Sequence, residues 1–155
     1  MFSSRDRFAI LECGVDRWND YRHQHPETLV LNFVVMPGAQ LPKVDFHQTI
    51  LMESDLSRAN LVGAILRGSI LRKTDLRQAD LREAVLSGAD LCRANLAGAD
   101  LREANLTAAF LRRTNLRGAD LSTSVGLTEN QISQAIGDDA TRLPCGLGRP
   151  ASWSA

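Results

Sequence analysis

Aromatic residues are scarce in this chain, and their scarcity limits the kind of core that it can build. Only 5% of the 155 residues are aromatic, although 44% are hydrophobic. Large aromatic side chains usually contribute much of the buried area in a broad globular core. The composition therefore favours a narrow core made of Leu and Ala.

Cysteine and long apolar runs are also lacking. Cys13, Cys92 and Cys145 are odd in number and widely separated, which favours free thiols in a reducing compartment over a disulfide framework. Residues 1–14 lack the continuous apolar segment of a signal peptide. The longest apolar run, residues 29–36, is far shorter than the roughly 20 residues of a membrane span. We expect a cytoplasmic protein of bacterial type that has no membrane partner.

Neither sign of charge is in excess, and no motif of catalysis is visible. The chain holds 18 Lys and Arg against 18 Asp and Glu, which argues against a disordered tail or a broadly basic nucleic-acid-binding chain. There is no nucleophile elbow, no phosphate-binding glycine loop and no Cys beside a base. His23 and His25 lack partners at zinc-ligand spacing, so we interpret them as a solvated pair. We expect no enzyme activity, no metal and no cofactor.

What the chain does contain is a five-residue repeat that runs unbroken from Ala39 to Thr123. The third place holds Leu in 16 of 17 units and Phe46 in the other, and the first place holds Ala in 11. Neither a helix nor a straight strand keeps a five-residue period on one side. If the chain turns once per unit, places one and three point inward and place two faces solvent. We expect the third-place side chains to form the core: Leu41, Phe46, Leu51, Leu56, Leu61, Leu66, Leu71, Leu76, Leu81, Leu86, Leu91, Leu96, Leu101, Leu106, Leu111, Leu116 and Leu121.

Outward residues suggest how many units make one turn. Ile50 recurs as Ile70, and Asp80 recurs as Asp100 and Asp120. This period of 20 indicates four units per turn. Coils this short cannot bury their own apolar side chains, so each coil depends on its neighbours.

The unit at residues 79–83, Ala-Asp-Leu-Arg-Glu, resembles the A(D/N)LXX consensus of the pentapeptide-repeat proteins. That resemblance implies an all-β solenoid, a right-handed quadrilateral parallel β-helix of about four to five coils. It says little about function, because the fold is shared by proteins with different roles.

The repeat is flanked by two different segments. Phe8, Leu11, Val15 and Trp18 form an amphipathic stripe that predicts one helix over about residues 4–24. The segment GVDRWNDYR at its centre resembles the leader that often precedes the repeats in this family. We therefore expect three parts: an N-terminal helix and linker at residues 1–28, the β-helix at 29–124, and a C-terminal cap at 125–155. The first two units of the β-helix, 29–33 and 34–38, depart from the consensus.

The C-terminal segment carries the signals of a short helix. Thr128 followed by Gln131 is a capping-box arrangement, and Gly137 is the expected stop. The tail, GLTENQISQAIGDDATRLPCGLGRPASW, resembles the GLT…LP…RPxxW ending of many family members. Its expected role is to shield Leu116 and Leu121 from water.

Sorting outward residues by wall predicts two docking surfaces. An apolar strip and a basic partner-binding group lie on one wall, and the N-terminal helix is expected to cover the strip or the open first coil; a homodimer interface is the alternative. With Glu53 and Asp90 included, the five cations of this wall give a net charge of +3, against −3 on the opposite wall. The strip is Val30, Ile50, Met52 and Ile70; the basic group is Arg72, Lys73, Arg93, Phe110, Arg112 and Arg113; the opposite wall holds Asp80, Glu83, Asp100, Glu103 and Asp120 with Arg82 and Arg102.

Three functional classes follow from these surfaces. A non-catalytic scaffold for an unknown protein partner fits best, because a rigid solenoid offers flat charged and apolar walls. The resemblance also implies a DNA-mimicking modulator of gyrase or topoisomerase, as some members are, but the repeats hold 12 Lys or Arg against 10 Asp or Glu. A nucleic-acid binder is disfavoured by the absence of stacking aromatics. The plain alternative is a solvated surface of mixed charge.

Overall fold

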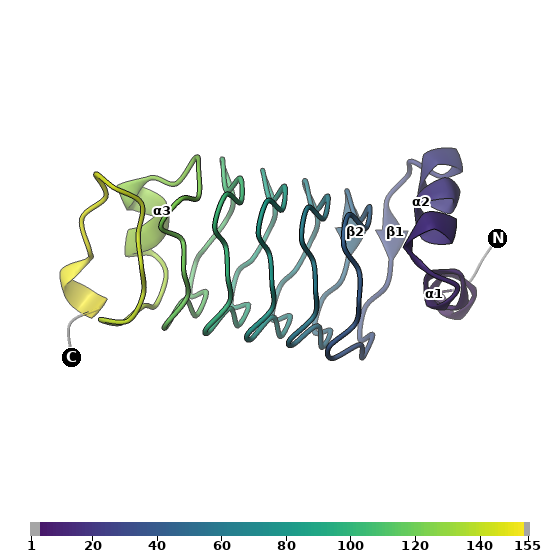
Figure 1. Ribbon diagram of the computed structural model, residues 1–155, viewed down its shortest axis with the longest axis horizontal. Helices are drawn as coiled ribbons and strands as arrows, with labels where there is room; N and C mark the ends of the chain where they lie inside the picture. The colour runs from purple at the N-terminus through teal and green to yellow at the C-terminus, as the bar shows by residue number, and fades with distance from the viewer. Residues whose placement is uncertain (1–3, 154–155) are drawn as a thin grey trace.

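Residues 4–153 are described by the structure, which is a computed structural model. The chain forms a rod of stacked coils with helices at both ends (Figure 1). None of the helices in residues 4–153 has the length and apolar character needed to span a membrane. The elements in chain order are α1 (Ser4–Glu12), α2 (Val15–Gln24), β1 (Leu29–Val30), β2 (Thr49–Ile50), α3 (Glu129–Ser133) and a 3-10 helix (Ala151–Trp153).

The rod is a right-handed, four-sided β-helix with 20 residues per coil. Strands β1 and β2 pair in parallel, with Val30 opposite Ile50, and single parallel bridges continue the same step of 20 from Val35↔Asp55 to Asn105↔Val125. Most sides form only single bridges because the chain turns after each unit. We name the four sides wall A (29–33, 49–53, 69–73, 89–93, 109–113), wall B (34–38, 54–58, 74–78, 94–98, 114–118), wall C (39–43, 59–63, 79–83, 99–103, 119–123) and wall D (44–48, 64–68, 84–88, 104–108).

The corners between walls depend on a left-handed backbone at the fifth place. Glycine takes this place in units such as 84–88, where Gly88 has φ 66. Elsewhere a residue with a full side chain does so, as Arg93 does at φ 61, which costs about 1–2 kcal/mol. Backbone bonds to the next coil offset this cost, for example from Arg93 N to Arg112 O at 3.0 Å. These turns place the fourth- and fifth-place side chains in columns along the edges of the rod.

The core is the column of inward side chains. All 17 third-place residues, from Leu41 to Leu121, are at most 5% exposed, and the backbone ladder between coils passes along their flanks, as in the bond from Leu81 N to Asp100 O at 2.8 Å. First-place hydroxyls add bonds between coils. The hydroxyls of Thr74 and Thr114 each donate to a carbonyl of the preceding coil at 2.7 Å.

The N-terminal segment forms two helices, not the single helix expected from the apolar stripe. The break lies at Gly14, whose φ of 111 is incompatible with a continuous helix. Helix α2 covers the open first coil: Trp18 is fully buried, its indole donates to Asp45 O at 2.7 Å, and its ring lies 5.5 Å from that of Phe46. The apolar strip on wall A is not covered, since Val30 is 36% exposed.

A buried arginine fixes the linker after α2. Arg22 donates to His25 O at 2.6 Å, to Glu27 O at 2.9 Å and to His47 O at 2.7 Å. Burial lowers the pKa of the Arg22 guanidinium, despite the neighbouring carboxylates of Asp45 and Glu27. Because its partners come from the linker and the first complete coil, Arg22 joins the helical cap to the solenoid.

The C-terminal cap begins with α3 and then rejoins the coil. The Thr128 and Gln131 capping box is present, but the helix ends at Ser133, before the expected stop at Gly137. Beyond α3, bridges from Asn115 to Ile136 and from Asp120 to Arg142 continue the stack.

The same segment covers the last leucines. Thr141 donates its hydroxyl to Leu116 O at 2.9 Å, as first-place threonines do in the regular coils. Trp153 is buried against Gly137, where even a Cβ would come within 2.3 Å of the indole ring. The tail therefore adds an irregular partial coil, because the inserted helix interrupts the repeat.

Candidate interaction surfaces

The predicted basic residues gather at the corner between walls A and B. We call the group Arg72, Lys73, Arg93, Arg112 and Arg113 the basic edge. Lys73, Arg93 and Arg113 occupy the fifth place of successive wall A units, so they form one column with a step of about 4.8 Å.

Only part of the basic edge is neutralised by the protein itself. Arg72 Nε lies 2.5 Å from Asp90 Oδ2, and this bond raises the pKa of Arg72. Lys73 Nζ lies 2.7 Å from Glu53 Oε1. Within residues 4–153, the guanidinium groups of the other three have no acidic partner: Arg93, Arg112 and Arg113.

A shallow groove of about 240 Å³ runs along the basic edge. The groove is lined by residues from both predicted docking surfaces. Met52 of the apolar strip lies in it together with four of the five cations of the basic edge. Cys92 completes the lining. Phe110 lies apart, in a separate groove beside the C-terminal cap, where it is 60% exposed.

The apolar strip is present on wall A but short. Val30, Ile50 and Ile70 are stacked by consecutive parallel pairs, and Asp90 ends the series. Phe33, at the corner beside Val30, is 67% exposed and extends the apolar surface at the first coil.

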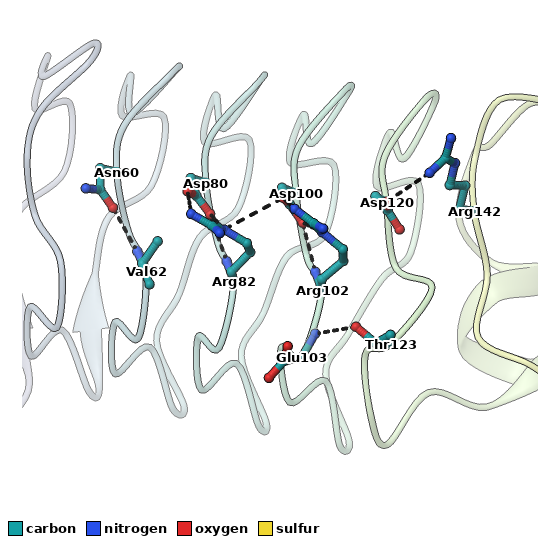
Figure 2. Close-up of polar contacts among 10 residues, drawn as sticks. All are labelled: Asn60, Val62, Asp80, Arg82, Asp100, Arg102, Glu103, Asp120, Thr123 and Arg142. Atoms are coloured by element: carbon teal, nitrogen blue, oxygen red, sulfur yellow. Dashed lines mark hydrogen bonds and ion pairs between the residues drawn. The ribbon is translucent and has the colours of Figure 1, made fainter.

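Wall C is less acidic than its sequence suggests. Figure 2 shows that its aspartates form a ladder in which each carboxylate meets an arginine. Arg82 contacts Asp80 at 2.7 Å and Arg102 contacts Asp100 at 2.5 Å. These hydrogen bonds lower the pKa values of both Asp80 and Asp100.

The third aspartate of this ladder, Asp120, pairs with an arginine of the C-terminal tail. Arg142 lies 3.5 Å from Asp120, and it could not be assigned to wall C before the irregular coil was known. Its inclusion changes the net charge of the seven residues assigned from the sequence from −3 to −2, and Lys43, which also lies on wall C, reduces the net charge of this wall to −1. Glu83 and Glu103 keep free carboxylates within the described part of the chain.

Wall D carries an apolar ladder that the sequence analysis missed. Ile65 and Val85 occupy neighbouring second places, where the repeat more often has Asp or Asn; Asn105 follows them, and Val125, which pairs with Asn105, continues the column into the tail. Ile65 and Val125 are 39% and 53% exposed. The recurrence of Ile65 as Val85, 20 residues later, was the available signal.

The structure offers little for metal or redox chemistry. Among residues 4–153, no group of three or more His, Cys, Asp or Glu side chains is arranged to hold a metal ion. Cys13, Cys92 and Cys145 are free thiols. Burial and the neighbouring Asp90 raise the pKa of Cys92, which lowers its thiolate fraction and hence its reactivity.

Comparison with solved structures gives several similar chains. A pentapeptide repeat protein, Rfr23, from the cyanobacterium Cyanothece 51142 is 26% identical, with a TM-score of 0.54 over 88% of this chain and 96% of that one. A pentapeptide repeat protein of the Arabidopsis thaliana thylakoid lumen is 31% identical, with a TM-score of 0.36 over 71% and 81%. QnrB1, a plasmid-mediated fluoroquinolone resistance protein, is 18% identical, with a TM-score of 0.41 over 72% and 69%.

Comparison with curated proteins gives no match. The family model of pentapeptide repeats, eight copies long, matches residues 31–68, 59–98 and 84–122. These matches span more than half of the chain and coincide with the coils of the solenoid. The chain therefore belongs to the pentapeptide-repeat family.

Proposed function

We propose that this chain is a non-catalytic protein-interaction module and that an acidic protein binds along its basic edge. The observation that carries the proposal is the difference in ion pairing between the two charged sides. On wall C every aspartate of the ladder has an arginine partner. At the basic edge, Arg93, Arg112 and Arg113 have no such partner within residues 4–153. Like charges one coil apart repel, so an acidic partner stabilises them.

The shape of the edge supports a protein partner over a small substrate. Its groove of about 240 Å³ is shallow, whereas small-molecule sites usually enclose roughly 300–1,000 Å³. Guanidinium groups in a column bind carboxylates with two parallel hydrogen bonds. Met52 adds an apolar contact in the same groove. A row of Asp or Glu side chains on an exposed strand or helix matches this surface.

A DNA-mimicking modulator of gyrase is supported less well. Such a mimic needs a broad surface of uncompensated negative charge, and on wall C the arginines neutralise the aspartate ladder. Glu83 and Glu103 alone form a short acidic column. Measuring duplex DNA binding alongside protein capture distinguishes nucleic-acid binding at the basic edge from protein binding there.

Charge reversal tests the proposal. The full-length chain and its Arg93→Glu/Arg113→Glu variant are used to capture partners from lysate of the native cell, with duplex DNA binding and gyrase supercoiling measured in parallel. We expect the wild type to retain an acidic protein that the variant loses at least 10-fold, since buried charge pairs at interfaces contribute several kcal/mol.

The matched control is Arg58→Glu/Arg117→Glu. It changes the net charge by the same amount at two exposed arginines outside the basic edge. Retention of the partner by the control and its loss from the edge variant support the proposal. Equal capture by both variants contradicts it, and strong inhibition of supercoiling by the wild type replaces it with the DNA-mimic function.

A further inference from the structure

We infer that wall D is a self-association surface, which binds wall D of a second copy across a two-fold axis parallel to the rod. The inference is independent of the basic edge, which lies at the corner between walls A and B. It begins from the second places, where wall D has the adjacent pair Ile65 and Val85, preceded by Asp45 and followed by the uncharged Asn105, with Val125 continuing the column in the tail. At the equivalent places of wall C the chain has Asp80, Asp100 and other polar residues.

Two successive units of wall D consist of small or uncharged residues. The units 84–88 and 104–108 contain no charged residue. The corner from wall D to wall A is lined by small side chains over two coils, so another backbone can approach closely. These small residues are Ser87, Gly88, Thr107 and Ala108.

A second copy cannot continue the β-helix at either end, because both ends are covered. At the first coil, Trp18 of α2 packs on Phe46. At the last coil, the tail bonds to Leu116 and Leu121 through Ile136 O and Arg142 O. End-to-end continuation of the β-helix is therefore blocked, and the apolar side remains available.

A stable dimer contact is large enough to include the corners of wall D as well as its face. A stable contact buries about 800 Å² on each partner, which is about a tenth of the 7982 Å² that the chain exposes. The face of one wall is narrow, so a contact of this size includes both corners. One corner carries Glu83, and the other carries Arg67; neither side chain has an ion-pair partner within residues 4–153.

These two charges select the orientation of the second copy. A two-fold axis parallel to the rod places the corner of Glu83 opposite the corner of Arg67 in the other copy. The two residues differ by 16 positions, less than one coil, so their heights along the rod differ by about 4 Å. An axis across the rod instead places Glu83 and Glu103 of both copies on the same side, where like charges repel. The parallel arrangement forms two Glu83–Arg67 pairs around an apolar centre.

Sedimentation of the full-length chain from 1 to 200 μM tests the inference. We expect a monomer–dimer equilibrium that persists in 0.5 M NaCl, since its centre is apolar. Ile65→Asn/Val85→Asn should raise the dimer dissociation constant at least 10-fold, because the fold accepts Asn at these places, as at Asn60. The control Val30→Asn/Val35→Asn, which removes two exposed valines from walls A and B, should leave the constant within about twofold.

Charge exchange tests the orientation separately. Arg67→Glu should weaken the dimer and Arg67→Glu/Glu83→Arg should restore it. A wild type that is monomeric throughout, or a dimer unchanged by Ile65→Asn/Val85→Asn, overturns the inference. A dimer weakened by the wall D variant but not restored by charge exchange overturns the two-fold arrangement.

Discussion

Removing one hydroxyl from the core should reveal how first-place threonines join adjacent coils. Thr74→Val keeps the shape of the side chain but deletes the bond from Thr74 Oγ1 to Leu51 O, 2.7 Å long and buried. Within residues 4–153, no backbone N–H donates to Leu51 O. Thr114→Val makes the same change at Leu91 O, which still accepts from Ala94 N at 2.9 Å.

The two variants should therefore differ in stability although their chemistry is identical. Thr114→Val loses only the net value of one hydrogen bond, about 0.5–1.5 kcal/mol. Thr74→Val also leaves a buried carbonyl without a partner, so we expect about 1–3 kcal/mol. Urea unfolding followed by circular dichroism measures both, with an unchanged slope required for the comparison. If Thr114→Val costs as much as Thr74→Val, or more, the single-partner explanation for Leu51 O is wrong.

Three other substitutions test the core, the N-terminal cap and the acidic wall. Leu81→Asp removes about 1.5–3 kcal/mol of burial and adds an unpaired charge, so it should abolish the cooperative thermal transition. Trp18→Ala should lower the unfolding free energy by about 3–5 kcal/mol in urea titration and expose Phe46 to a hydrophobic dye. Arg102→Gln should slightly lower the unfolding free energy at pH 7, because an exposed ion pair contributes little. Because Arg102 depresses the pKa of Asp100, that difference should shrink as pH falls below about 3.9, the unfolded value; a difference independent of pH would contradict the ion pair.

The repeats were predictable because a period of five has only one simple structural solution. Leu at each third place requires the chain to turn once per unit, and the recurrence of Ile50 as Ile70 gives four units per coil. The wall or corner on which each outward charge lies then follows from its position in the five-residue unit. The same reasoning places Arg93 and Arg113 in one column at one edge.

The two ends were less predictable, for physical reasons. The apolar stripe continues past Gly14, but the helix cannot, because Gly14 has a φ of 111. The sequence also does not indicate which open surface α2 covers. In the tail, the inserted α3 breaks the step of 20, so Asn115 pairs with Ile136 and Asp120 with Arg142. Thr141-Arg142-Leu143 resembles the first three places of a repeat unit. Because this segment is not a multiple of 20 residues from the regular units, the sequence alone could not assign it to a wall. This is why the cation of wall C was missed.

Site-directed photo-crosslinking from the basic edge tests the proposed function most directly. Cys92 lies in the groove of the edge, and with Cys13 and Cys145 replaced by Ser it can carry a thiol-linked crosslinker, attached at alkaline pH because the pKa of this thiol is raised. The matched control places the crosslinker at Ala97→Cys, the same place of the next unit on wall B. We predict that position 92 captures the acidic protein partner and that position 97 captures at least 10-fold less. Equal capture from the two positions, or nucleic acid as the product at position 92, would contradict a protein-binding basic edge.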